Sequence, residues 1–183
     1  MADAHRSPRD FKGYAQLEAF NILLVPGTAL WFGRPKTLAE AAILSTAIIA
    51  TAGFLAIGTL YWRGLAARLR TSEAASRSAA LRTADRCERP LVVVTTLASV
   101  MVMVGVLAFG WTGAIIAAAA LTALAWLEYV NYYHWQLQHF DRMADTRRLF
   151  TTRRFRRAHM ARHLARYRTS QSAISTPAST SSA

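Results

Sequence analysis

Four apolar stretches divide this chain, and each is long enough to cross a lipid bilayer as a helix. They cover residues 14–32, 37–62, 91–109 and 114–137. A helix of about 20 residues spans the roughly 30 Å hydrocarbon core, because each residue adds about 1.5 Å. The pattern therefore predicts an all-α fold, an integral membrane bundle of four transmembrane helices.

The basic residues are kept apart from these apolar stretches. The chain has 22 lysines and arginines and a formal net charge of +12. All but two of them lie in residues 1–13, 63–90 or 138–168. In a soluble protein such a charge would suggest nucleic-acid binding, but this segregation argues against a nucleic-acid partner. By the positive-inside rule it predicts a multi-pass protein of the cell inner (plasma) membrane, with both termini and residues 63–90 in the cytoplasm. The excess of arginine over lysine suggests GC-rich codons and a bacterial source.

The connections between the stretches carry local signals. Thr37 and Glu40 have the spacing of a capping box, which gives Glu40 a structural role. Residues 63–90 form a basic cytoplasmic loop in which we expect helical extensions around a break near Thr71. Pro90 is expected to open the third span. The lone cysteine, Cys87, falls in this loop and excludes an intramolecular disulfide.

The segment after the last span is arginine-rich from residue 138 to 168, and residues 169–183 carry no charge. We expect the charged part to form a cytoplasmic helical extension and the uncharged part to be disordered. The favoured interpretation is electrostatic contact with anionic lipids, where each basic residue contributes about 1 kcal/mol. A docking arm for a partner protein or nucleic acid is the alternative. The residues predicted to contact anionic lipid are Arg147, Arg148, Arg153, Arg154, Arg156 and Arg157.

Two carboxylates lie inside the predicted spans, each three residues before an asparagine. Glu18 precedes Asn21 in the first span, and Glu128 precedes Asn131 in the last. Glu18 lies about four residues from the cytoplasmic start of its span and Glu128 about five from the end of its own, so both lie roughly 6–8 Å deep. A charged side chain in a bilayer costs a few kcal/mol, so two glutamates at one depth need partners, protons or water. We expect the two pairs to meet.

Helical spacing brings further polar residues of the last span to the same region. The predicted polar intramembrane site comprises Glu18, Asn21, Glu128, Asn131, Tyr132, His134, Gln138 and His139. One interpretation is a water-accessible pocket, open to the cytoplasm, for a cation, a proton or a lipid headgroup. The other is an interhelical lock that fixes helix register. The histidine pattern does not match a haem or zinc site, so no metal or cofactor is expected.

A short motif resembles that of one group of proteins. The run Glu128-Tyr129-Val130-Asn131-Tyr132-Tyr133, together with Glu18 and Asn21, resembles small uncharacterised bacterial four-helix membrane proteins that end their last span in E-[FY]-[IV]-N-Y-[FY]. This resemblance implies a shared site and no particular chemistry. Four short spans with a glutamate in the first are also similar to small multidrug resistance transporters, although this chain is longer and has a second glutamate late in its fourth span.

Three functions from different classes follow from these features. The preferred one is a non-enzymatic membrane component that binds lipid or a partner through the polar site and the basic tail. The second is a proton-coupled small-molecule transporter that uses Glu18 and Glu128, acting as a homodimer. The third is a lipid-modifying enzyme that uses Glu128 with His134 or His139. A homo-oligomer or a membrane protein partner is compatible with each of them.

Overall fold

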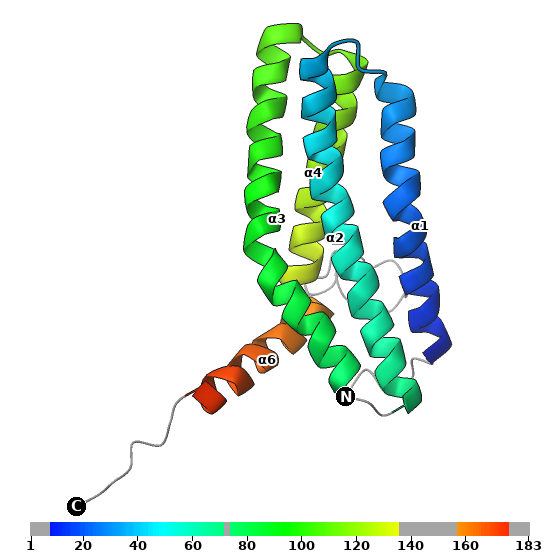
Figure 1. Ribbon diagram of the computed structural model, residues 1–183, viewed down its shortest axis with the longest axis vertical. Coiled ribbons are helices and arrows are strands. Elements are labelled where there is room, and N and C mark those ends of the chain that lie inside the picture. Colours follow the sequence, from blue (N-terminus) through cyan, green and yellow to red (C-terminus); the bar gives the residue numbers. More distant parts are fainter. Residues whose placement is uncertain (1–7, 72–73, 136–156, 176–183) are drawn as a thin grey trace, which may run out of the picture.

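The computed structural model describes residues 8–71, 74–135 and 157–175. In these ranges the chain forms the helices α1 (Pro8–Gly33), α2 (Leu38–Thr71), α3 (Ala74–Phe109), α4 (Gly113–Tyr133) and α6 (His159–Ser175). The first four stand side by side, and α6 lies across one end of the bundle (Figure 1). The predicted all-helical fold is confirmed for the described residues.

Three of these helices are long and apolar enough to cross a membrane. They are the parts of α2, α3 and α4 that cover Leu38–Arg68, Arg77–Phe109 and Gly113–Tyr133. Their length and composition indicate a membrane protein. α1 is not in this group, and its sequence includes Glu18 and Asn21 among its apolar residues.

Residues 63–90 form helical extensions around a break after Thr71, as expected, because α2 continues to Thr71 and α3 begins at Ala74. The helix bounds differ from the predictions at three places. Pro90 lies inside α3 instead of opening a helix. Its position is exposed, so water can satisfy the backbone carbonyl that proline leaves without a donor.

The other two differences concern the end of α4 and the tail. α4 stops at Tyr133 instead of residue 137, because His134 leaves the helical conformation (φ −128°, ψ −75°). The His134 carbonyl instead accepts a hydrogen bond from the backbone N–H of Ala158 (3.0 Å). α6 continues to Ser175, so residues 169–175 are helical where disorder was predicted. Residues 176–183 lie outside the described residues.

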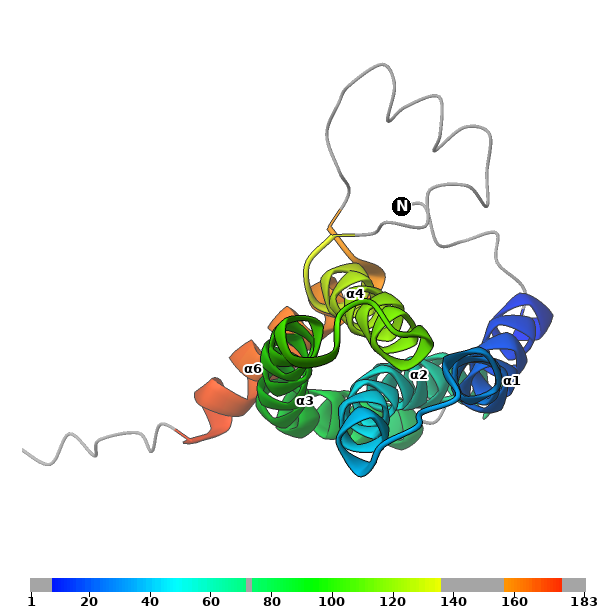
Figure 2. The same ribbon diagram turned by 90° about the horizontal axis from the view of Figure 1, so that it is seen from above.

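Small side chains let the four long helices pack closely. Among the described residues six alanines are fully buried, a pattern typical of membrane helices, where backbones approach through small residues. They are Ala47, Ala50, Ala84, Ala98, Ala118 and Ala125. The hydroxyl of Thr51 adds a polar link, because it donates to the carbonyl of Leu121 (2.9 Å) and so joins α2 to α4. Figure 2 shows the four helices grouped around this common interior.

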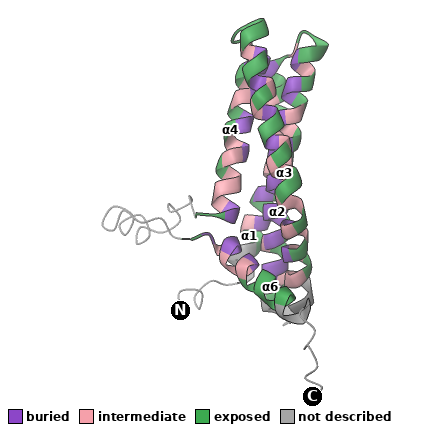
Figure 3. Ribbon diagram, turned by 90° about the vertical axis from the view of Figure 1, so that its left-hand side faces the viewer, coloured by how far each residue is buried: buried purple, intermediate pink, exposed green. Residues whose placement is uncertain are grey.

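The outer surface of the bundle is strongly apolar. Leu23 and Leu107 are 77% and 86% exposed, and many other large hydrophobic side chains are at least 40% exposed. Exposed positions run along the outer faces of the long helices in Figure 3. A soluble monomer rarely shows an apolar surface of this extent, whereas contact with lipid tails accounts for it.

The predicted capping box at the start of α2 is confirmed. The backbone N–H of Glu40 donates to Thr37 Oγ1 (3.1 Å), and Glu40 Oε2 accepts from the N–H groups of Lys36 (2.7 Å) and Thr37 (3.2 Å). These bonds satisfy backbone donors that the first helical turn leaves without partners. Glu40 therefore has the structural role that the sequence predicted.

α6 packs against the bundle through its apolar side chains. Met160 and Leu164 are buried in one cluster with Tyr61, Leu81 and Tyr133. This helical part of the arginine-rich segment contacts α3 and α4, and the predicted contact with anionic lipid stays a prediction. The helix packs there because Met160 and Leu164 lie one helical turn apart and together form a small apolar face.

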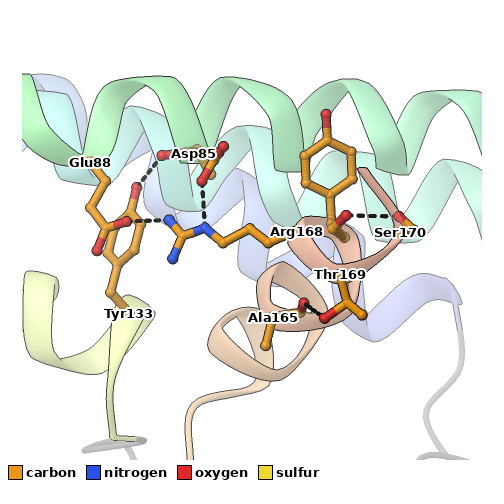
Figure 4. A network of polar contacts seen from close by, with 9 residues as sticks. Asp85, Glu88, Tyr133, Ala165, Arg168, Thr169 and Ser170 are labelled. Carbon is orange, nitrogen blue, oxygen red and sulfur yellow. Dashed lines mark hydrogen bonds and ion pairs between the residues drawn. The ribbon is translucent and has the colours of Figure 1, made fainter. Parts of the chain in front are cut away.

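An ion-pair network fixes the far end of α6. Arg168 Nε lies 2.6 Å from Asp85 Oδ1, and Arg168 Nη2 lies 2.5 Å from Glu88 Oε2. Figure 4 shows the guanidinium between the two carboxylates, close to Tyr133. The Tyr133 hydroxyl donates to the carbonyl of Ala84 (2.8 Å), so α3, α4 and α6 meet at this point.

Candidate functional site

Tyr132 connects the carboxyl groups of Glu18 and Glu128. Its hydroxyl donates a hydrogen bond to Glu18 Oε1 over 2.5 Å, which joins α4 to α1. The same hydroxyl is hydrogen-bonded to the carboxyl group of Glu128. Glu18 and Tyr132 are both buried. The structure thus brings together the two glutamates, as the sequence predicted, through a tyrosine that sequence analysis had placed in the site without a specific role.

The number of hydrogens at this junction limits its protonation state. A phenol has one hydrogen to donate, and here it goes to Glu18. Both carboxyl groups can therefore be hydrogen-bonded to this hydroxyl at once only if one of them carries a proton and donates it. Electrostatic repulsion between Glu18 and Glu128 also opposes two negative charges at this junction.

Each glutamate also has one buried oxygen without a partner. Glu18 Oε2 and Glu128 Oε2 have no hydrogen-bond partner among the described residues. A buried polar atom that lacks a hydrogen bond costs about 1–3 kcal/mol. Both atoms can accept a hydrogen bond or a cation, so the pair has capacity for a second proton or another positive group.

The two asparagines hold different positions around the pair. Asn131 is hydrogen-bonded to Glu128, one turn away on α4. Asn21 is half-buried on α1, one turn from Glu18. The prediction that each E-x-x-N pair lies on one helix face is consistent with both placements.

Gly58 of α2 makes the room that Tyr132 occupies. A Cβ atom at position 58 would lie 2.2 Å from the Tyr132 hydroxyl oxygen and 2.6 Å from its Cζ. Both distances are far below van der Waals contact, so the tyrosine lies directly on the α2 backbone. Three helices therefore define the junction: α1 supplies Glu18, α2 the space and α4 Tyr132 with Glu128.

The other predicted site residues do not join this junction in the described structure. His134 is the exposed C-cap of α4, and its ring packs against Tyr129 with centroids 4.9 Å apart. Arg157 is exposed and pairs through its backbone with Trp135. Gln138, His139, Arg147, Arg148, Arg153, Arg154 and Arg156 lie outside the described residues.

A second polar cluster was missed by sequence analysis. The Tyr61 hydroxyl contacts Nδ1 of His159 and lies 3.0 Å from Nδ1 of His163, which links α2 to α6. Trp62 stacks on the His159 ring at a centroid distance of 6.2 Å. The signal available was the i, i+4 spacing of the two histidines, but sequence analysis considered histidines only near the last span. Among the described residues, no group of three or more His, Cys, Asp or Glu side chains could hold a metal ion.

Comparison with known proteins gives no further assignment. No protein-family model, no curated protein and no solved structure matches this chain.

Proposed function

We propose that this chain is a proton-coupled transporter of small organic cations, with Glu18, Tyr132 and Glu128 as its proton-binding site. The observation that supports it is the single hydroxyl shared by the buried carboxyl group of Glu18 and the half-buried one of Glu128. In this proposal the pair holds one proton and has two further acceptor oxygens. A site of this kind can exchange a proton for another cation without leaving two negative charges buried.

The proposal includes four transmembrane helices, with α1 as the fourth. α1 has 26 residues, or about 39 Å of helix at 1.5 Å per residue, which is enough to cross a bilayer. Its polar Glu18 is buried against α4, whereas Leu17, Phe20 and Leu23 are exposed. The polar residue that lowers the mean hydropathy of α1 is therefore hidden inside the bundle, and the surface that α1 would present to lipid is more apolar than its whole sequence. The charge distribution supports cytoplasmic termini and an inner-membrane location.

The same geometry favours a proton over a lipid headgroup as the ligand at this site. Glu18 and Tyr132 are both buried. A headgroup would need an opening at the carboxylates, whereas a proton needs only a transient path of water. The His134 ring packs on Tyr129, and this contact gives no support to an enzyme that pairs it with Glu128.

Infrared spectroscopy and a proton-flux assay together test the proposal. The full-length protein in lipid vesicles should show a carbonyl band from a protonated carboxylic acid, and Glu128→Gln should remove that band. Vesicles that contain a pH-sensitive dye should report proton movement when the lipophilic cation tetraphenylphosphonium is added outside. Glu128→Gln should abolish this response.

Glu40→Gln is the matched control for both measurements. It also removes a buried glutamate from a membrane helix, but glutamine can keep the capping box. The Glu40→Gln protein should retain the band and the flux. Equal proton movement in wild-type and Glu128→Gln vesicles would show that the site does not couple protons to transport.

A further inference from the structure

A basic pocket lies between α1 and α2 on the outside of the bundle. It has a volume of about 470 Å³, within the usual range for ligand pockets. Its polar lining comes from Lys12 and Gln16 of α1 and Arg63 of α2. The rest is built from alanines, namely Ala15, Ala19, Ala66 and Ala67. The lining residues that the structure describes include two cations and no acid.

The position of this pocket relates it to the apolar surface. Lys12 lies near the first turns of α1 and Arg63 in the last third of α2, so the pocket opens at the end of the bundle where α6 lies (Figure 1). Beyond it along the same two helices, most of the large exposed side chains are apolar. Leu23 follows Ala19 by one turn and is 77% exposed, and Leu60 precedes Arg63 by one turn and is 43% exposed.

A basic pocket followed by an apolar strip matches the headgroup and the acyl chain of a phospholipid. A phosphate carries negative charge and accepts hydrogen bonds, and it fits between an ammonium, a guanidinium and an amide. The short alanine side chains leave space for the glycerol region. An acyl chain can continue along the apolar strip beside Leu23 and Leu60. A free phosphate would use the cations but not the adjoining strip.

We propose that the pocket formed by Lys12, Gln16 and Arg63 binds the headgroup of an anionic phospholipid. The lipid lies in the groove between α1 and α2, with its phosphate at the two cations. This requires α1 to lie in the membrane, as proposed above, but it does not involve the Glu18, Tyr132 and Glu128 site. The two proposals can therefore fail separately.

The test measures lipid binding to the full-length protein in detergent. Phosphatidylglycerol should raise the unfolding temperature at lower concentration than phosphatidylcholine does. Combining Lys12→Gln with Arg63→Gln should weaken phosphatidylglycerol binding by roughly tenfold, because each cation beside an anionic headgroup contributes several-fold. Both side chains are exposed, so the unfolding temperature without lipid should not change.

Two further variants separate the pocket from general electrostatics. Arg82→Gln with Arg86→Gln removes the same charge from exposed positions of α3 and should leave phosphatidylglycerol binding unchanged. Ala19→Trp should fill the pocket and weaken binding without a change in charge. Equal weakening by the two arginine-containing pairs, or full binding by Ala19→Trp, would overturn the proposal.

Inorganic phosphate distinguishes the two possible sources of the anion. At millimolar concentration it should neither raise the unfolding temperature nor displace phosphatidylglycerol. If phosphate alone reproduces the stabilisation and competes with the lipid, the pocket is a site for a free anion and the lipid assignment is wrong.

Discussion

Tyr132 has one hydroxyl hydrogen and two carboxyl groups within hydrogen-bonding reach. Glu18 accepts that hydrogen, so in the proposed site Glu128 supplies its own. A change at either glutamate therefore alters the hydrogen-bond arrangement of the other, although they lie on different helices. The two side chains behave as one site.

A double-mutant cycle should detect this coupling. Glu18→Gln and Glu128→Gln keep the side-chain shape and remove the option of charge, so each protein should fold. Groups in one hydrogen-bond network couple by about 0.5–3 kcal/mol, whereas distant groups add within about 0.5 kcal/mol. We expect thermal unfolding in detergent to give non-additive effects. Strict additivity would mean that the carboxyl groups act independently.

Gly58 provides a second test at the residue scale. Gly58→Ala would place Cβ 2.2 Å from the Tyr132 hydroxyl oxygen, so the ring has to move. Overpacking of this kind typically costs about 1–3 kcal/mol, and here it should also disturb the bond to Glu18. Gly27→Ala is the control, because no atom lies within 4 Å of a Cβ at that position in α1. Unfolding temperatures should fall for Gly58→Ala and stay the same or rise for Gly27→Ala.

Helical spacing and depth were enough to predict that Glu18 and Glu128 share a level. The same arithmetic could not assign the central role to Tyr132, because several polar side chains occupy its face of α4. That role depends on how α1, α2 and α4 approach one another. The approach depends in turn on the absence of a side chain at Gly58, which is far away in sequence.

At the scale of elements, α6 is attached to the bundle by apolar packing and by one arginine. Burial alone would lower the pKa of Arg168, but the carboxylates of Glu88 and Asp85 raise it above its ordinary value. Because the pKa of Arg168 is higher in the folded than in the unfolded protein, the ion pair stabilises the fold fully at pH below the unfolded-state pKa. This stabilisation is lost only as pH rises through the folded-state pKa. Arg168 therefore stays charged near neutral pH, where salt and not pH weakens the pair.

Substitutions in α6 should show that packing contributes more than this ion pair. Leu164 is 2% exposed, and replacement of a buried leucine by alanine costs about 2–5 kcal/mol. Partly exposed ion pairs contribute about 0–1 kcal/mol. Hydrogen exchange across residues 159–175 should therefore speed up strongly for Leu164→Ala and slightly for Arg168→Gln. Arg166→Gln, at an exposed position, is the control. An equal effect of the first two variants would contradict this ranking.

The sequence predicted structural features whose residues are close together in the chain. It did not predict features that depend on contacts between residues far apart in the chain. The Thr37 and Glu40 capping box lies within four residues, so spacing alone identified it. The docking of α6 depends on Met160 and Leu164 meeting Tyr61 and Leu81. In sequence these two apolar residues are surrounded by arginines, which is why the segment was predicted to be a surface contact.

At the scale of the whole molecule, the distribution of polar and apolar side chains is the reverse of that in a soluble protein. The exterior is apolar, and a polar junction is buried. Large hydrophobic side chains such as Leu107 and Leu23 are outside, and Glu18 is inside. The apolar stretches predicted this in outline, since three of them form helices that could cross a membrane. Their number alone does not fix whether α1 crosses too, or which end faces the cytoplasm.

Cysteine labelling with a membrane-impermeant maleimide can answer both questions. Cys87 is a poor reporter, because it is partly buried against the core, so it should first be replaced by serine. Single cysteines can then be placed at three exposed positions: Lys12 near the start of α1, Lys36 before α2 and Arg86 of α3. Lys36→Cys should preserve the capping box, which uses only the backbone of residue 36.

Four spans with cytoplasmic termini predict one labelling pattern. In intact cells Lys36→Cys should react, whereas Lys12→Cys and Arg86→Cys should react only after the membrane is permeabilised. Labelling of Lys12→Cys together with Lys36→Cys would mean that α1 does not cross, since those positions bracket it. Labelling of Lys12→Cys and Arg86→Cys alone would mean that the orientation is reversed. The carboxyl pair would then lie near the outer leaflet, because Glu18 is less than two turns from Lys12.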